Sequence, residues 1–63
     1  MAIGTVISLD RGIGFINVGR DSRDVLFRPN DARDFVEAGD LVEFEVVPNG
    51  HEGQLRAINI RLR

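Results

Sequence analysis

The chain has 63 residues, of which 43% are hydrophobic and 29% are charged, and it contains seven glycines and no cysteine. This length allows one small domain spanning residues 1–63, and the absence of cysteine excludes disulfides, thiol chemistry and cysteine-based zinc sites. The eight basic residues, all arginine, are outnumbered by ten acidic residues, and the formal net charge of −2 argues against a strong non-specific polyanion binder.

The composition also predicts no metal site, cofactor or membrane partner. The single histidine, His51, cannot build a histidine-based metal site alone. No apolar run approaches the roughly 20 residues of a membrane span, and the first residues lack the charged start and apolar stretch of a signal peptide. We therefore expect a cytoplasmic protein. Neither His51 nor the scattered carboxylates form a pattern that predicts an enzyme.

Three β-like segments occupy the first half of the chain. Residues 4–9 are rich in β-branched side chains and end at a turn signal, residues 10–12, which predicts a strand followed by a hairpin. A polar loop separates the next two predicted strands, which cover residues 13–18 and 24–28, and Pro29 ends the second of them.

A connector follows at residues 30–40, and it holds the only plausible helical turn of the chain. Asn30 is a suitable N-cap for this turn, and Gly39 is a suitable end for the segment.

Two alternating segments complete the chain. Residues 41–47 are predicted to form a strand with one wet face, whose buried face carries Val42, Phe44 and Val46. A glycine-bearing hairpin loop then leads to a last strand at residues 54–62. Alternation there places Ile58, Ile60 and Leu62 on one side and Ala57, Asn59 and Arg61 on the other.

Five strands in so short a chain cannot form two packed sheets of useful size. Closing into a small barrel removes the exposed edges and gives one shared interior. The sequence therefore predicts an all-β, five-stranded antiparallel barrel of the oligonucleotide-binding (OB) type. Phe35 of the connector is expected to plug one end of the barrel, with a ligand contact as the alternative.

Two motifs carry a family resemblance. Residues 11–16 (RGIGFI) and 24–28 (DVLFR) resemble, in order and separation, the two RNA-binding motifs of the cold-shock domain family. Residues 4–6, 39–46 and 53–60 are similar to the family's first, fourth and last strands. The short turn, Pro29 and residues 39–42 are also similar to the cold-shock-like domains that precede the catalytic part of RNase II-type exoribonucleases.

The resemblance implies binding of single-stranded RNA or DNA on an outward face of the second and third strands, where exposed aromatic rings stack on bases. Strand alternation places the candidate side chains on that face, away from Val25 and Phe27, which are predicted to point inward. The candidate residues are Arg11, Ile13, Phe15, Asn17, Leu26 and Arg28, with Ser8 of the first strand as a further polar contact.

This face is poorer in aromatic rings than the family pattern. The chain has no Trp or Tyr, and Ile13 and Leu26 stand where the motifs carry aromatics, so Phe15 is the remaining stacking residue. We expect weaker binding than that of a typical relative, and the implied role is that of an RNA chaperone or regulator. The alternative is a barrel without nucleic-acid affinity, which uses Ile13 and Leu26 to contact a protein partner or a second copy of itself.

Overall fold

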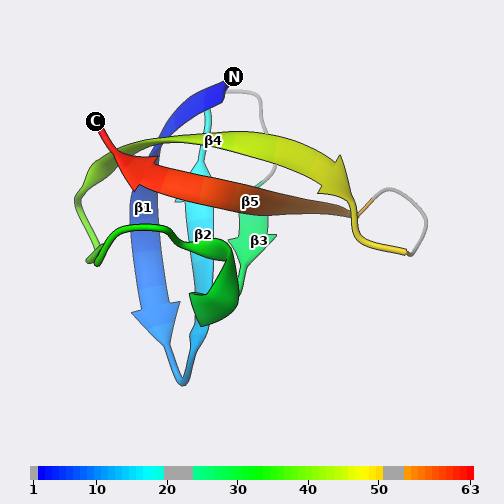
Figure 1. Ribbon diagram of the computed structural model, residues 1–63, viewed down its shortest axis with the longest axis horizontal. Helices are drawn as coiled ribbons and strands as arrows, with labels where there is room; N and C mark the ends of the chain where they lie inside the picture. Colours follow the sequence, from blue (N-terminus) through cyan, green and yellow to red (C-terminus); the bar gives the residue numbers. More distant parts are fainter. Residues whose placement is uncertain (1, 20–23, 51–53) are drawn as a thin grey trace.

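The computed structural model describes residues 2–19, 24–50 and 54–63 (Figure 1). Its elements are β1 (Ala2–Asp10), β2 (Ile13–Asn17), β3 (Val25–Phe27), a 3₁₀ turn η1 (Pro29–Asp31), β4 (Leu41–Pro48) and β5 (Leu55–Leu62). The predicted strand positions are confirmed, with ends that differ by no more than two residues. His51 lies outside the described residues.

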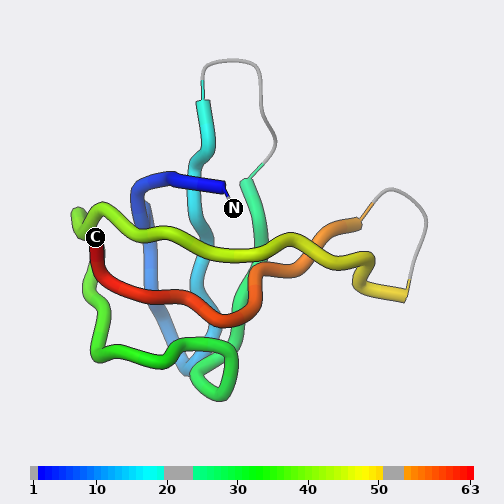
Figure 2. Tube along the Cα trace, turned by 45° about the horizontal axis from the view of Figure 1, so that its top comes forward, coloured from blue at the N-terminus to red at the C-terminus, as the bar shows by residue number. Residues whose placement is uncertain are grey.

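The strands close into a barrel in the order β1-β2-β3-β5-β4. In Figures 1 and 2, β1, β2 and β3 run side by side, and β4 and β5 cross them. The prediction of a purely antiparallel barrel is wrong, because β3 and β5 pair in parallel at Leu26 and Arg56. A closed ring with an odd number of strands cannot alternate in direction all the way round, so one pair must be parallel.

β1 belongs to both halves of this ring. Its first residues pair with β4 up to Thr5, and from Thr5 onward it pairs with β2, with a β-bulge between Val6 and Ser8. Gly4 allows the bend, since a Cβ at this position would lie 2.6 Å from the backbone oxygen of Asn17. The curvature that closes the barrel therefore depends on a bulge and on one missing side chain.

The barrel interior holds a core of fully or nearly fully buried side chains. They are Val6, Ile16, Val25, Phe27, Val36, Val42, Phe44, Ala57 and Ile60. The inward positions predicted for Val25, Phe27, Val42 and Phe44 are confirmed. Gly14 of the first motif has a packing role, because a Cβ there would collide with the Phe27 ring.

The predicted alternation of the last strand is wrong. Ala57 is fully buried and Leu62 is 46% exposed. The pairing of β5 with β4 passes from Ile58 opposite Glu45 to Arg61 opposite Glu43, so β5 carries an extra residue. Asn59, with φ of 53°, lies in this bulge, and its left-handed backbone restarts the alternation.

One inward position of β4 was also predicted wrongly. Val46 is 40% exposed rather than buried. The late part of β4 projects beyond β3 together with β5 (Figure 1), so few neighbouring strands cover this stretch.

The connector corrects two further expectations. Pro29, whose ring fixes φ, starts the helical turn, so Asn30 lies inside the turn and Arg28 occupies the N-cap position. Phe35 does not plug the barrel end, because it is 81% exposed while the adjacent Val36 is buried. The chain then turns at Gly39, with φ of 98°, and enters β4.

Within the described residues, no helix is long and apolar enough to cross a membrane.

Candidate nucleic-acid interface

The predicted binding side chains lie on the outer surface of β1, β2 and β3 and in the turns at their ends. Strand pairing places Phe15 beside Ser8 on one side and beside Leu26 on the other. We call this surface the platform, and it consists of Ser8, Arg11, Ile13, Phe15, Asn17, Leu26 and Arg28.

The apolar part of the platform follows β2. The Phe15 side chain is 38% exposed and Ile13 is 45% exposed, while Leu26 is half-buried. Gly14 and Ile16, which alternate with Ile13 and Phe15 along β2, are buried and face the core. An aromatic ring with an open face is the group on which a nucleic-acid base stacks.

The arginines lie at one end of the platform. Arg11 occupies the two-residue turn between β1 and β2 with φ of 54°, and Gly12 beside it has φ of 80°. Arg28 follows β3 directly and is exposed. Among the residues that the structure describes, neither arginine forms a salt bridge. A guanidinium group in such a position can meet a phosphate or a base plane.

Polar groups lie at both ends of the platform. The Asn17 Nδ2 group donates a hydrogen bond to Asp24 Oδ1 over 3.3 Å, which links the end of β2 to the start of β3. Asp10 pairs with Ile13 and places a carboxylate close to the arginine end. The platform therefore carries charges of both signs.

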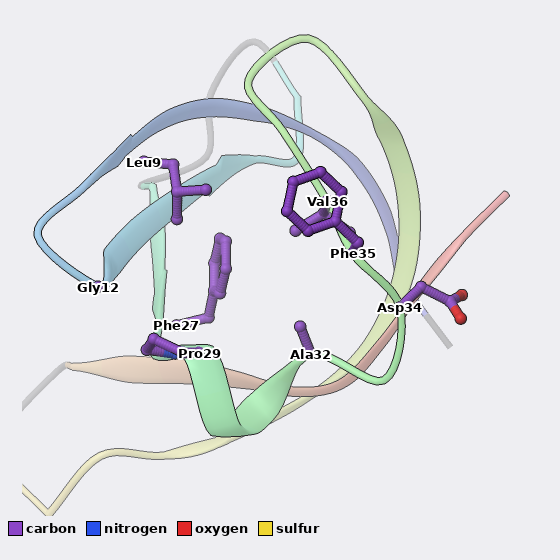
Figure 3. Close-up of a pocket in the computed structure, with 8 residues that line it drawn as sticks. All are labelled: Leu9, Gly12, Phe27, Pro29, Ala32, Asp34, Phe35 and Val36. Atoms are coloured by element: carbon purple, nitrogen blue, oxygen red, sulfur yellow. The ribbon is translucent and has the colours of Figure 1, made fainter.

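A cavity of about 260 Å³ lies at one end of the barrel, between the β1–β2 turn and the connector. Leu9, Phe27, Phe35 and Val36 are among its lining residues, and the exposed Phe35 ring lies next to Val36 (Figure 3). The Asp34 carboxylate points away from the other labelled side chains, and its Oδ2 accepts a hydrogen bond from the Leu62 backbone N–H.

The backbone arrangement is that of a known domain. A Drosophila Unr cold-shock domain chain, CSD456, superposes with a TM-score of 0.80 at 28% sequence identity, covering 98% of the present chain and 26% of the Unr chain. This chain has the cold-shock domain fold. No protein-family model matches the sequence, and a search of curated proteins finds no match.

Cold-shock domains are in general binding modules for nucleic acids rather than enzymes. In this chain the six candidate residues named from the sequence lie at the platform, on β2, on β3 and in the turns that adjoin them. The structure thus groups residues from two motifs separated in the chain. Their role in binding stays a prediction.

Sequence reasoning missed one feature of this surface, an ion pair between the end of η1 and β5. Arg56 Nη2 lies 2.8 Å from Asp31 Oδ1, and Arg56 Nε donates to Asp31 Oδ2 over 3.1 Å. The Arg28 backbone N–H also donates to Oδ2, over 3.0 Å. The partners are 25 residues apart in the chain, and the parallel pairing of β3 with β5 brings them together.

This pairing sets the charge state of Asp31. Burial raises the pKa of its carboxyl, but the hydrogen bonds from the Arg56 side chain and the Arg28 N–H, with the charges of both arginines, outweigh burial and hold the pKa below its usual value. The hydrogen bond to Asp31 likewise raises the pKa of Arg56. Both groups are therefore ionised at neutral pH.

Proposed function

We propose that this domain binds single-stranded RNA or DNA across the platform. The observation that carries the proposal is the partly exposed Phe15 ring, which lies in register between Ser8 and Leu26 on a cold-shock fold. A base stacked on Phe15 would also contact the apolar surfaces of Ile13 and Leu26. Base stacking of this kind contributes roughly 1–3 kcal/mol per base.

The arginines define the second part of the proposed mechanism. Arg11 and Arg28 lie at the same end of the β2–β3 pair and would neutralise phosphates of a strand that crosses it. Each phosphate contact with a single strand contributes about −0.7 to the slope of log K against log salt. Binding should therefore weaken as salt rises, while the overall negative charge keeps the affinity low.

A domain that holds unpaired strands in this way favours the melting of weak nucleic-acid secondary structure. The role that we propose is accordingly that of an RNA chaperone or regulator, without a catalytic step.

The test is an amide-shift titration of the labelled protein with a short pyrimidine-rich strand at low and moderate salt. We expect shifts at residues 11–17 and 26–28 that shrink as salt increases. The Phe15→Ala variant should stay folded and bind at least about fivefold more weakly, because a stack worth roughly 1–3 kcal/mol is lost. The matched control is Leu41→Ala, which removes an apolar side chain of similar exposure, 49%, outside the platform.

Two results would contradict the proposal. One is equal loss of binding in both variants, which would deny Phe15 a special role. The other is a platform whose amides do not shift at millimolar strand. If in that case Leu26→Glu changes the oligomeric state, the exposed apolar surface around Ile13 serves a protein contact instead.

A further inference from the structure

We propose that Arg56 of β5 extends the platform and provides a second stacking surface, the flat face of a guanidinium group held in place by Asp31. This inference rests on the proposed function, because it concerns the same bound strand. It adds a binding residue from a part of the chain that neither sequence motif includes.

The position of Arg56 follows from the sheet register. Leu26 of β3 pairs with Arg56 of β5, and paired residues of neighbouring strands project to the same face. Leu26 lies between two buried residues of β3, and Arg56 precedes the buried Ala57. Both side chains therefore lie on the outer surface, and the row Ser8, Phe15, Leu26 continues onto β5.

The two hydrogen bonds to Asp31 fix the plane of the guanidinium group. A two-point contact between an arginine fork and a carboxylate removes the rotation that an exposed arginine otherwise has. Asp31 is itself held, since it is only 6% exposed and accepts the Arg28 N–H. The Arg56 side chain nevertheless stays 37% exposed, which leaves surface for a ligand.

The spacing suits a separate base. Adjacent strands lie about 4.8 Å apart, so Phe15 and Arg56, two strands apart in the row, are separated by roughly 10 Å. A base on Arg56 is thus a neighbour of the base on Phe15 and does not compete with it. A preorganised guanidinium plane replaces, in part, the aromatic rings that the platform lacks.

The charge of the pair distinguishes this role from a phosphate contact. Asp31 neutralises Arg56, so Arg56 contributes its plane to the strand and little net charge. Loss of the planar guanidinium group of Arg56 should lower the affinity for the strand without changing the salt dependence of binding. Loss of Arg28, which has no salt bridge among the described residues, should instead reduce the salt slope by roughly one phosphate contact.

The experiment compares Arg56→Lys with Arg61→Lys, a matched change of an exposed arginine farther along the same strand. Lysine keeps the positive charge but lacks a planar guanidinium group. We expect Arg56→Lys to bind a short pyrimidine strand roughly tenfold more weakly with an unchanged salt slope, and Arg61→Lys to bind like the unmodified protein. Circular dichroism checks that each variant is folded.

A second readout uses the unmodified protein and does not depend on the variant. A base stacked on Arg56 should move its Nε–H signal upfield in the same titration that moves the Phe15 amide. If the Phe15 amide moves and Arg56 stays still, or Arg56→Lys binds normally or loses salt slope, the inference is wrong and the proposed function stands. If neither signal moves, both fail.

Discussion

At Phe15 the requirements of folding and of binding are separate. Its chain neighbours face inward, where Gly14 makes room for the Phe27 ring and Ile16 is fully buried, while its own ring is partly exposed on the outer surface. Removing the ring therefore leaves the core intact. A residue of this kind can be tested for binding without a confounding loss of the fold.

At Arg11, folding and binding favour different residues. The backbone conformation of the turn favours asparagine, whereas the proposed phosphate contact needs the guanidinium group. The Arg11 φ of 54° lies in the left-handed region, which costs most residues about 1–2 kcal/mol and which asparagine tolerates better. We expect Arg11→Asn to raise the free energy of unfolding by about 1 kcal/mol and to weaken binding of a single strand. Urea unfolding and a strand titration at fixed salt measure the two effects.

The opposite signs make this prediction specific. An unchanged affinity would remove Arg11 from the platform and leave it as a turn residue. A lower stability would mean that the Arg11 side chain holds the hairpin through contacts that outweigh the backbone cost. Arg61→Asn, on an exposed stretch of β5, controls for the lost charge.

At the scale of the element, β5 shows where alternation alone misleads. Ile58, Ile60 and Leu62 have the spacing of one strand face, but a single extra residue at Asn59 shifts every later side chain to the other face. Asparagine inside a β-like run is the available signal, since it adopts positive φ more readily than other non-glycine residues. That signal is too weak to place a bulge by itself.

Asn59 also ties three elements together. Its Oδ1 accepts two hydrogen bonds from Arg33 of the connector, and its Nδ2 donates to Glu45 of β4 over 2.8 Å. We expect Asn59→Ala to lower the free energy of unfolding by about 1–3 kcal/mol, from backbone strain and lost hydrogen bonds. Asn59→Gly keeps the backbone freedom and should cost less.

Urea unfolding of both variants separates the two contributions. Equal losses would assign the stabilisation to the side-chain hydrogen bonds alone. No loss in either variant would show that β5 keeps its register without the Asn59 side chain or its backbone conformation.

The local part of the fold was accessible from the sequence. Strand positions follow from β-branched runs and turn residues, and the side-chain faces of β2 and β3 follow from alternation over a few residues. The candidate residues on the platform were found from the resemblance of the two motifs to the cold-shock family, and alternation then placed them on the outer face. The Asp31–Arg56 pair was not, because it depends on which distant strands become neighbours, and no local pattern encodes that choice.

At the scale of the whole molecule, ring closure explains this gap. Successive strands alternate in direction along the chain, so a closed ring of five brings two strands of equal direction together, and in the order β1-β2-β3-β5-β4 these are β3 and β5. Among the described residues, β3 and β5 pair at Leu26 with Arg56, and the connector adds a parallel bridge between Ala32 and Ile60. The Asp31–Arg56 ion pair adds a side-chain contact to this short pairing, which we call the seam.

The seam should make the barrel sensitive to acid. The pKa of Asp31 is lowered by folding, so its stabilising effect is fully present above the unfolded value of about 4 and is lost as pH falls through the lower folded value. Asp31→Asn should cost about 1–3 kcal/mol of unfolding free energy at pH 7, and less below pH 4. Unfolding of both proteins from pH 7 to pH 3 measures the difference, with Glu37→Gln, an exposed acid of the connector, as control. A difference that stays constant over this range would show that the charge of Asp31 does not hold β3, η1 and β5 together.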